Sequence, residues 1–333
     1  MRYKYRGLIK QNIAPVGATK VVISDENGNR IGSVPLGHLT RPKDTKLYSF
    51  GLLSDIHCAG NNSEQKARFD RALTYFEQQG CVFCCHSGDM SNVGFHKDDS
   101  ANGYPFDDYQ MAEYKSVIDA HPNLPVYGCC GNHESYGKTI DCCVHLLPEY
   151  TNIPSLHYSM EYNNDVFIFI SQPTTAKPMS DDAFAWLKTT LEENKDKRCF
   201  LFNHSFVDDN DSGNPYGLYT NKTYDWWGSK KQEFINTMKN YNVVMFHGHS
   251  HMKPLMQEEI KYSNYSKQLG FHSVHVPACN YGRYVENGET LKIDYTVGYG
   301  YLVDVYTDYI ILNGFSVLDN NKLVGIATYK IDI

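Results

Sequence analysis

Five short blocks of the chain carry oxygen and nitrogen side chains that bind divalent metal ions. In chain order they read Asp55-Ile56-His57, Gly88-Asp89, Gly131-Asn132-His133-Glu134, Asn203-His204 and Gly248-His249-Ser250-His251. Carboxylates, amides and imidazoles suit hard and borderline metal ions. Two adjacent ions of that kind can activate water and clamp a phosphate ester. The residue types and their order therefore predict a dinuclear metal site for phosphate chemistry.

Each block ends an apolar run that reads as a buried strand. The runs cover Leu47–Ser54, Cys81–Ser87, Leu124–Cys130, Cys199–Asn203 and Val243–His247. Continuous β-branched, aromatic and cysteine runs that alternate with helical segments are typical of a mainly parallel sheet covered on both faces. Ligand crevices in such sheets form at the carboxyl ends of the strands. We therefore expect the five blocks to meet at one edge of the sheet.

The spacing within the blocks agrees with this expectation. Side chains two residues apart in an extended chain point the same way. Asp55 can then converge with His57, and His249 with His251. A glycine also precedes several ligands, which permits the tight turns and the close backbone approach that such an edge requires.

In these blocks the chain resembles the calcineurin-like metallophosphoesterase superfamily. The family pattern is Asp-x-His, Gly-Asp, Gly-Asn-His-(Asp/Glu), His and Gly-His-x-His, and all five parts match in order. Any one part occurs often by chance, whereas the ordered set is specific. The resemblance covers residues 47–333 and implies the four-layer αββα metallophosphoesterase fold, a two-sheet β-sandwich flanked by helices.

Carried over position by position, the resemblance implies two sets of ligands that share Asp89. The first set is Asp55, His57, Asp89 and His251, and the second is Asp89, Asn132, His204 and His249. A hydroxide bridging the two ions would attack phosphorus. Two divalent cations outweigh two carboxylates, so the site would stay positive and attract a phosphate anion. The ligand types do not choose among manganese, iron, zinc, cobalt and nickel.

His133 is not a ligand in the family pattern. The resemblance places it beside the metals, where it can protonate the leaving oxygen or hydrogen-bond the phosphate, and its ordinary pKa near neutrality suits that task. Many family members carry Asp three residues after the bridging Asp to orient this histidine. This chain has Asn92 there. An amide can orient the ring but cannot stabilise imidazolium by charge, so we expect the histidine to serve less effectively as a general acid.

Two less specific interpretations stand beside catalysis. A single histidine at a strand end is more often a hydrogen-bonded structural residue, and we interpret His86, His247, His272 and His275 in that way. The metal site as a whole can also belong to a binding or interaction module with little turnover. Hydrolysis is the favoured interpretation because every expected ligand is present.

The residues after the bridging Asp bear on the substrate. Protein Ser/Thr phosphatases of the superfamily have Asp-Arg-Gly where this chain has Asn92-Val93-Gly94. Purple acid phosphatases place a Tyr ligand at the position of Asn92 and lack the first histidine. Neither class fits. The net charge is −7, and the sequence has no basic run interleaved with aromatics. This composition disfavours binding of extended nucleic acid. We expect a small phosphoester substrate, with a diester favoured over a monoester.

Three loops are candidates for selecting the substrate: residues 92–108, residues 206–229 and Pro277–Arg283. Long loops inside a compact domain are often functional. Trp226 can stack on a base or sugar, although packing is the more common role of such an aromatic. Arg283 is a candidate phosphate contact, with a surface salt bridge as an equal alternative.

The remaining patterns predict the scaffold. Helical spacing covers residues 64–79, 109–120, 181–194 and 230–240. Tyr158–Ser171 reads as a hairpin that turns at residues 163–165, and several short strands between Tyr299 and Ile331 would extend a second sheet. Residues 46–333 would thus form one metallophosphoesterase domain of the α/β class.

Residues 1–45 contain two strand-like runs joined by Asn27-Gly28, which predicts a small β-rich N-terminal extension. It would either pack as extra sheet or serve docking or oligomerisation. The first residues have no apolar signal core, and no apolar run is long enough to span a bilayer. Several of the ten cysteines lie in the predicted strands, where they behave as small hydrophobes. We therefore expect a cytoplasmic protein without membrane association.

Overall fold

The computed structural model describes residues 20–24, 30–35, 45–60, 63–92, 109–135, 147–171, 179–207, 226–251, 269–286, 290–318 and 323–333. The chain divides into two units, Met1–Thr45 and Lys46–Ile333. In the first unit, β1 (Lys20–Ser24) and β2 (Arg30–Pro35) pair antiparallel, with an irregular register after Ile23. The two strand-like runs expected before residue 45 thus form a β pair. The turn expected at Asn27-Gly28 lies outside the described residues.

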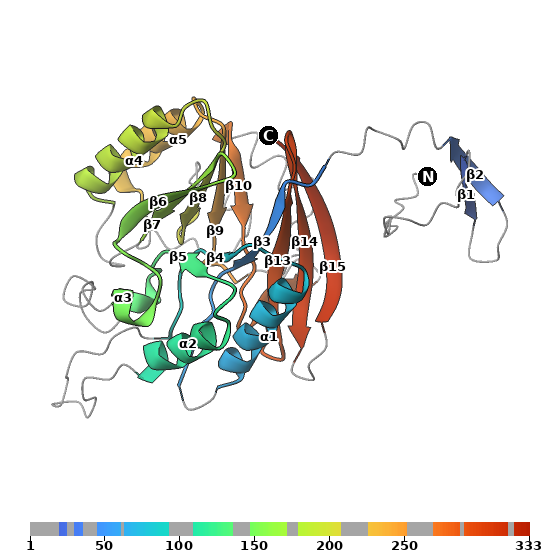
Figure 1. The fold of residues 1–333 in the computed structure, drawn as a ribbon, viewed down its shortest axis with the longest axis horizontal. Coiled ribbons are helices and arrows are strands. Elements are labelled where there is room, and N and C mark those ends of the chain that lie inside the picture. Colours follow the sequence, from blue (N-terminus) through green and yellow to red (C-terminus); the bar gives the residue numbers. More distant parts are fainter. Residues whose placement is uncertain are drawn as a thin grey trace. The chain divides into compact units, whose positions relative to one another are not determined.

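Two mixed sheets form the centre of the second unit (Figure 1). The six-stranded sheet has the order β15-β14-β13-β3-β4-β5, and the five-stranded sheet has the order β10-β9-β8-β7-β6. The strands of the first are β3 (Tyr48–Leu53), β4 (Cys84–His86), β5 (Val126–Gly128), β13 (Val297–Val305), β14 (Tyr309–Leu318) and β15 (Leu323–Asp332). Those of the second are β6 (His157–Tyr162), β7 (Asp165–Ile170), β8 (Cys199–Asn203), β9 (Val243–His247) and β10 (His272–His275).

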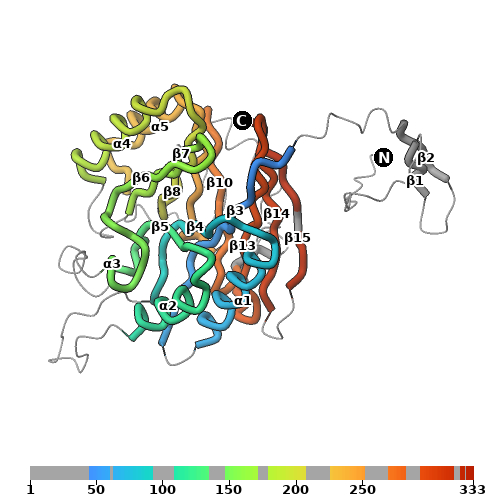
Figure 2. The backbone as a smooth tube through the Cα atoms, viewed as in Figure 1, coloured from blue at the N-terminus to red at the C-terminus, as the bar shows by residue number. Residues whose placement is uncertain are grey.

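Each sheet has a parallel core. The strands β3, β4 and β5 run parallel in one sheet, and β7 to β10 run parallel in the other. We expected all five ligand-bearing strands in a single sheet, and that expectation was wrong, because β3 to β5 and β8 to β9 belong to different sheets. The C-terminal strands join β3 through β13, from Tyr301↔Leu52 to Val305↔Tyr48 (Figure 2). An apolar run identifies a buried strand but does not say which strand lies beside it.

Helices cover the outer face of each sheet. The described helices are α1 (Glu64–Gln78), α2 (Tyr109–Ala120), α3 (Leu147–Tyr150), α4 (Asp181–Glu193) and α5 (Lys231–Met238). Ser63 caps α1 by accepting a hydrogen bond from the Lys66 N–H. The apolar sides of α1 and α2 pack with the six-stranded sheet, and those of α4 and α5 pack with the five-stranded sheet. Phenylalanines fill the space between the sheets, among them Phe50, Phe167, Phe200 and Phe246. The expected four-layer αββα fold is confirmed.

Most local predictions agree with the observed elements. The hairpin β6–β7 turns at Asn163 and Asn164, whose φ angles of 50° and 70° are those of a two-residue turn that follows the twist of the strands. The helix α5 is shorter than expected, since a 3₁₀ turn over Gly228–Lys230 precedes it. A small hairpin of β11 (Gly282–Glu286) and β12 (Thr290–Asp294) was not expected. In the described part of the chain, no helix combines the length and apolar character needed to cross a bilayer.

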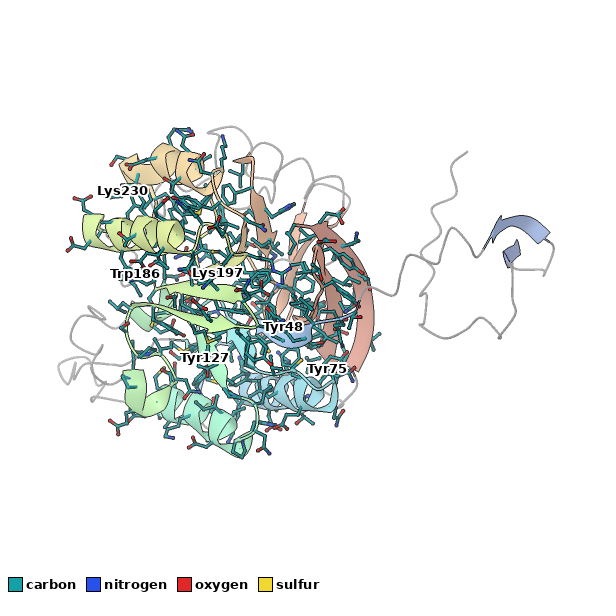
Figure 3. The ribbon with its side chains drawn as sticks, turned by 45° about the horizontal axis from the view of Figure 1, so that its top comes forward. Tyr48, Tyr75, Tyr127, Trp186, Lys197 and Lys230 are labelled. Carbon is teal, nitrogen blue, oxygen red and sulfur yellow. The ribbon has the colours of Figure 1, made fainter. Side chains whose placement is uncertain are left out.

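A buried ion pair of the five-stranded sheet is hydrogen-bonded to the six-stranded sheet, far from the ligand-bearing strand ends. The Arg198 Nε donates to Asp165 Oδ1 at 2.8 Å, and its Nη1 donates to the Tyr306 carbonyl at 2.7 Å. Tyr48, marked in Figure 3, donates its hydroxyl to Asp165 Oδ2 at 2.5 Å. Burial and the adjacent Asp165 raise the pKa of Tyr48 far above its ordinary value. These three side chains, here called the sheet clamp, link β3 of one sheet to β7 and β8 of the other.

Candidate dinuclear metal site

The carboxyl ends of the parallel strands of both sheets meet, and main-chain hydrogen bonds join the loops that follow them. The N–H of Asp55, after β3, donates to the Gly88 carbonyl after β4 at 3.0 Å. The N–H of His57 donates to the Asp89 carbonyl, also at 3.0 Å. Across the two sheets, the His249 N–H donates to the Asp55 carboxylate at 3.1 Å. The site is therefore assembled from strand ends of two sheets.

The structure gathers six of the seven expected ligands into two groups that share one carboxylate. Each residue offers one ligand atom, and within a group these atoms all lie within 4.8 Å of one another. The groups are Asp55, His57, Asp89 and His251, and Asp89, His204 and His249. Asn132, the seventh, is buried in the loop after β5. The N–H of its neighbour His133 donates to Asp89 Oδ1 at 2.9 Å, which holds this loop against the shared carboxylate.

Hydrogen bonds on the far side of two imidazoles fix which nitrogen faces the site. The Nδ1–H of His57 donates to Asn92 Oδ1 at 3.1 Å, and the Nδ1–H of His204 donates to the Ser87 carbonyl at 2.8 Å. Their Nε2 atoms then face the site and lie 3.5 Å and 3.0 Å from Asp89 Oδ2. Outer partners of this kind are typical of histidines that bind metal.

The donor atoms fit two divalent ions. The Nε2 atoms of His57 and His251 lie 3.3 Å apart, and His249 Nδ1 lies 3.3 Å from His204 Nε2. Two pairs of imidazole nitrogens thus converge beside the carboxylates of Asp55 and Asp89. Mixed imidazole and carboxylate donors suit first-row divalent metals, so the residues present match the two-ion site that the sequence predicts.

The backbone of the candidate ligands is strained. Asp55, His57, Asp89, His249 and His251 have φ angles of 50°, 52°, 55°, 72° and 57°. Residues with side chains rarely occupy this left-handed region, and such strain is concentrated at functional sites. We expected Asp55 with His57, and His249 with His251, to converge along extended chain. That reason was wrong, since left-handed turns orient these side chains.

The closely packed turns also depend on glycine. Gly88 has a φ of 104°, and a Cβ at Gly131 would lie 2.2 Å from Asp89 Oδ1. A side chain at residue 131 would therefore displace the shared carboxylate. Glycine at these two turns allows the loops after β4 and β5 to approach each other.

Electrostatics keep both carboxylates ionised. Burial alone would raise the pKa of Asp55, but His251, His57 and His204 hold it well below its ordinary value. Burial acts in the same direction on Asp89, and His204, His133 and His57 likewise lower its pKa. Burial would lower the pKa of His204, yet Asp89 and Asp55 raise it to about 9. The two carboxylates are thus available as anionic ligands.

His133 and Asn92 are arranged differently from the expectation. Nδ1 of His133 donates to the backbone carbonyl of Asn92 at 2.5 Å, whereas the Asn92 side chain contacts His57. The main chain, not the amide, therefore orients His133. Its Nε2 lies 3.9 Å from Asp89 Oδ2, and its side chain is 23% exposed. Burial lowers the pKa of His133 to about 4, although Asp89 opposes that shift.

Glu134 joins the loops after β4 and β5, a role that the sequence analysis did not assign. Its Oε2 accepts the N–H groups of Gly131 at 2.7 Å and Asp89 at 3.1 Å, and its Oε1 accepts the Ser91 N–H at 3.0 Å. Burial and the nearby Asp89 raise its pKa to about 7. The acidic end of the Gly-Asn-His-Glu block was the available signal, because a carboxylate can accept several N–H groups at once.

The candidate substrate residues lie in different surroundings. Trp226 is 3% exposed in the core beside α4 and α5, with its ring 4.8 Å from that of Trp227, which favours packing over stacking on a substrate. Arg283 belongs to β11, and the position of its side chain lies outside what the structure describes. Most of the loops 92–108 and 206–229 also lies outside the described residues.

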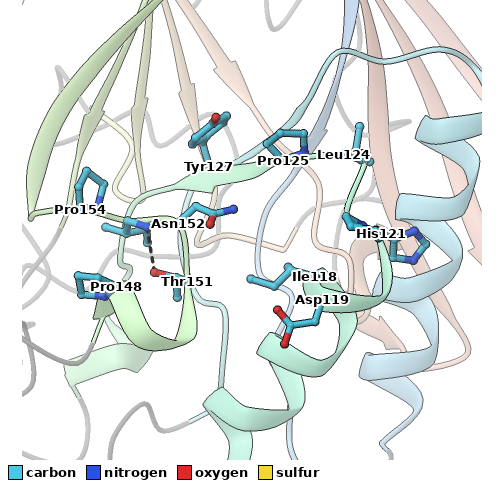
Figure 4. A pocket seen from close by; sticks show the side chains of 12 residues that line it. Ile118, Asp119, His121, Leu124, Pro125, Tyr127, Pro148, Thr151, Asn152 and Pro154 are labelled. Carbon is cyan, nitrogen blue, oxygen red and sulfur yellow. Dashed lines mark hydrogen bonds between the residues drawn. The ribbon is translucent and has the colours of Figure 1, made fainter.

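A separate pocket lies beside β5 and α3 (Figure 4). It has a volume of about 790 Å³, and Ile118, His121, Tyr127 and Asn152 are among its lining residues. The candidate metal ligands do not line it. The convergence of the candidate metal ligands, and not this pocket, therefore marks the candidate active site.

This fold and this buried Asp/His cluster define a metal-dependent phosphoesterase. The model of the calcineurin-like phosphoesterase family matches residues 48–274, and the chain belongs to that family. A search of curated proteins found no match. Among solved structures, a dimetal phosphatase from Danio rerio is similar, with 12% identity, a TM-score of 0.54, and coverage of 86% of this chain and 99% of that one. GAP50, the anchor in the inner membrane complex of Plasmodium, has 13% identity, a TM-score of 0.57, and coverage of 87% and 90%.

Proposed function

We propose that the chain hydrolyses a phosphodiester with two divalent ions held by Asp55, His57, Asp89, Asn132, His204, His249 and His251. The observation that carries the proposal is the pair of ligand groups that share Asp89. When bound, the two ions would supply an activated water and would neutralise charge on the phosphoryl oxygens. The strained turns and the outer hydrogen bonds of His57 and His204 support this assignment, because they orient the donors in advance.

His133 is proposed to act on the leaving oxygen. Its ring is held through Nδ1 by the Asn92 carbonyl, which leaves Nε2 toward Asp89 and toward the accessible side of the site. In the imidazolium form of His133, which a bound phosphate anion would favour, the Nε2–H can donate to a phosphoryl oxygen or pass its proton to the departing group. General acid catalysis of this kind contributes about 10²- to 10⁴-fold in rate.

A diester is proposed over a monoester for two reasons. The chain lacks the Asp-Arg-Gly arginine that grips a dianionic phosphate in the protein phosphatases of the superfamily, and has Asn92-Val93-Gly94 instead. The net charge of −7 also disfavours a highly charged substrate. A small diester carries a single negative charge and needs less compensation.

The test compares bis-p-nitrophenyl phosphate with p-nitrophenyl phosphate on protein stripped of metal and reloaded with Mn²⁺. We expect diester cleavage that requires metal, falls about 100-fold or more in His133→Ala, and is largely lost in Asp89→Asn. His272→Ala is the matched control, because His272 begins β10 at the end of the strand away from the site. Full diesterase activity in both site variants would overturn the proposal.

The alternative is a metal-bound interaction module with little turnover. The observation that favours it is the separate unit Met1–Thr45 with its own β pair, and a fold does not by itself fix function. One structure of similar fold is an anchor protein. This alternative predicts two bound metals, no turnover on either ester, and loss of a partner when residues 1–45 are deleted.

A further inference from the structure

Three aromatic rings form a row that begins at the candidate metal site. The ring of Tyr281 lies 4.4 Å from that of His251, between centroids, at an interplanar angle of 31°. The ring of Tyr295 follows at 5.3 Å and 49°. Tyr295 is 64% exposed, the highest value among the large hydrophobic side chains that the structure describes. The row therefore runs from a buried imidazole to a ring open to solvent.

The two tyrosines occupy the base of the small hairpin β11–β12. Tyr281 directly precedes β11, Tyr295 directly follows β12, and Gly282 is paired with Asp294 between them. The hairpin thereby keeps the two tyrosines close in space, although they are separated in sequence. The pairing explains why sequence reasoning selected the loop Pro277–Arg283 but did not identify this aromatic surface.

Arg68 fixes this base to the rest of the site. It lies on α1, is 3% exposed, and donates through Nη1 to the Asn280 carbonyl and through Nη2 to the Tyr295 carbonyl, the latter at 2.6 Å. The N–H of Asn280 donates in turn to the Asp55 carbonyl at 3.2 Å. The tyrosines are thus tied by main-chain contacts to a residue that is a candidate metal ligand. Such preorganisation lowers the entropic cost of binding.

We propose that Tyr281 and Tyr295 bind the ester group of the substrate, and that this group carries a planar aromatic ring such as a nucleobase. The inference rests on the proposed phosphodiesterase function and names its substrate class. A phosphoryl group held at the metals must extend at least one ester group out of the site, and the row of rings leads from His251 to the exposed ring of Tyr295. Stacking on aromatic side chains accepts any base and needs no positive charge, which agrees with the acidic composition of the chain.

The test uses two diesters that release the same p-nitrophenol. Thymidine 5′-(p-nitrophenyl phosphate) carries a nucleoside, and methyl p-nitrophenyl phosphate carries only a methyl group. The Mn²⁺-loaded protein is expected to prefer the nucleoside ester in kcat/KM, and Tyr295→Leu is expected to reduce that preference about 10-fold, the size of one base–aromatic contact. Tyr295→Phe should retain it. Tyr241→Leu, which removes a tyrosine on the turn before β9, should change neither rate.

A binding measurement separates this inference from the proposed function. Thymidine 5′-monophosphate and methyl phosphate are titrated calorimetrically into the Mn²⁺-loaded protein and into its Tyr295→Leu variant. Tighter binding of the nucleotide that depends on Tyr295 supports the inference even if neither diester is cleaved, in which case only the proposed hydrolysis fails. An equal loss for both esters in Tyr295→Leu, or no nucleoside preference in rate and in binding, overturns it.

Discussion

Asn92 holds two histidines with different atoms: its backbone carbonyl accepts from His133 and its side-chain oxygen accepts from His57. The residue that replaces the usual aspartate therefore supports a candidate metal ligand, while the orientation of His133 does not depend on which side chain stands at position 92. The two roles can be separated by mutation.

Asn92→Ala is expected to weaken metal binding and to spare the step that uses His133. Loss of an outer hydrogen bond to a ligating histidine typically costs about 10- to 100-fold in metal affinity. Titration of the stripped variant with Mn²⁺ should therefore give a raised half-saturation point and a nearly normal rate at saturation. Unchanged metal affinity with a rate as low as that of His133→Ala would contradict this assignment.

Glu134→Gln is expected to disturb the site more than Glu134→Asp. The carboxylate accepts three backbone N–H groups, and an amide would turn an NH₂ group toward at least one of these donors. A buried donor left without an acceptor costs about 1–3 kcal/mol. Denaturant unfolding and the stoichiometry of bound metal provide the measurement. The idea fails if the Gln variant binds two metals with the stability of the unmodified protein.

The architecture was predictable where one local signal decided the conformation. Helical spacing over residues 64–79 predicted α1, and Asn163-Asn164-Asp165 predicted the turn of β6–β7. The candidate ligands were predictable because the five motifs and their order can be read directly from the sequence. Their left-handed backbone was not, since φ at Asp55 or His249 is imposed by packing between loops that lie far apart in the chain. Tyr281 and Tyr295 were not predicted as a pair, because the pairing of β11 with β12 brings them together although they are separated in sequence.

The sheet clamp should contribute strongly to stability. Arg198→Leu would leave the buried carboxylate of Asp165 without its charged partner, which typically costs about 3–5 kcal/mol. Replacing both residues by leucine should recover part of that loss, because no unpaired charge remains. Urea unfolding of the two single variants and the double variant gives the coupling energy. A single variant that unfolds like the unmodified protein would rule out this role.

The stability of the fold is expected to fall between pH 6.5 and pH 5 through His86. The pKa of this histidine is lowered by burial, and by the nearby His204, to about 3. Its Nδ1 accepts from the Gly88 N–H, and its Nε2 is 3.1 Å from the Tyr114 hydroxyl. Below pH 6.5 the unfolded chain binds a proton at this histidine that the folded chain does not bind, so acid favours unfolding. At pH 5 the loss is about 2 kcal/mol.

His86→Gln removes this titration and provides the comparison. The variant can differ from the unmodified protein in its unfolding free energy at pH 7. The quantity to compare is therefore the change in unfolding free energy from pH 7 to pH 5, measured for each protein with EDTA present. We expect a smaller change in the variant. Identical changes in both proteins would show that His86 does not carry the effect.

Metal removal should lower the melting temperature. The site brings two pairs of imidazole nitrogens to 3.3 Å and holds five ligands in left-handed backbone. Both features destabilise the metal-free folded state, and bound ions would offset that destabilisation. A ligand present at 100 times its dissociation constant stabilises a protein by about 2.7 kcal/mol. Differential scanning calorimetry with Mn²⁺ and with EDTA checks this, and Asp89→Asn should show a much smaller difference between the two conditions.

The antiparallel pairing of β13 with β3 sets the order in which the protein can be completed during synthesis. The strand β3 leads directly into Asp55, yet one of its edges is covered by Val297–Val305, which the ribosome makes after every candidate ligand. Until then a nascent chain carries an uncovered apolar strand next to an unfinished metal site. Pairing between such distant segments forms slowly and leaves edges exposed to aggregation. Emergence of β13 from the ribosome, and not that of the last candidate ligand, is therefore the step after which the site can become rigid.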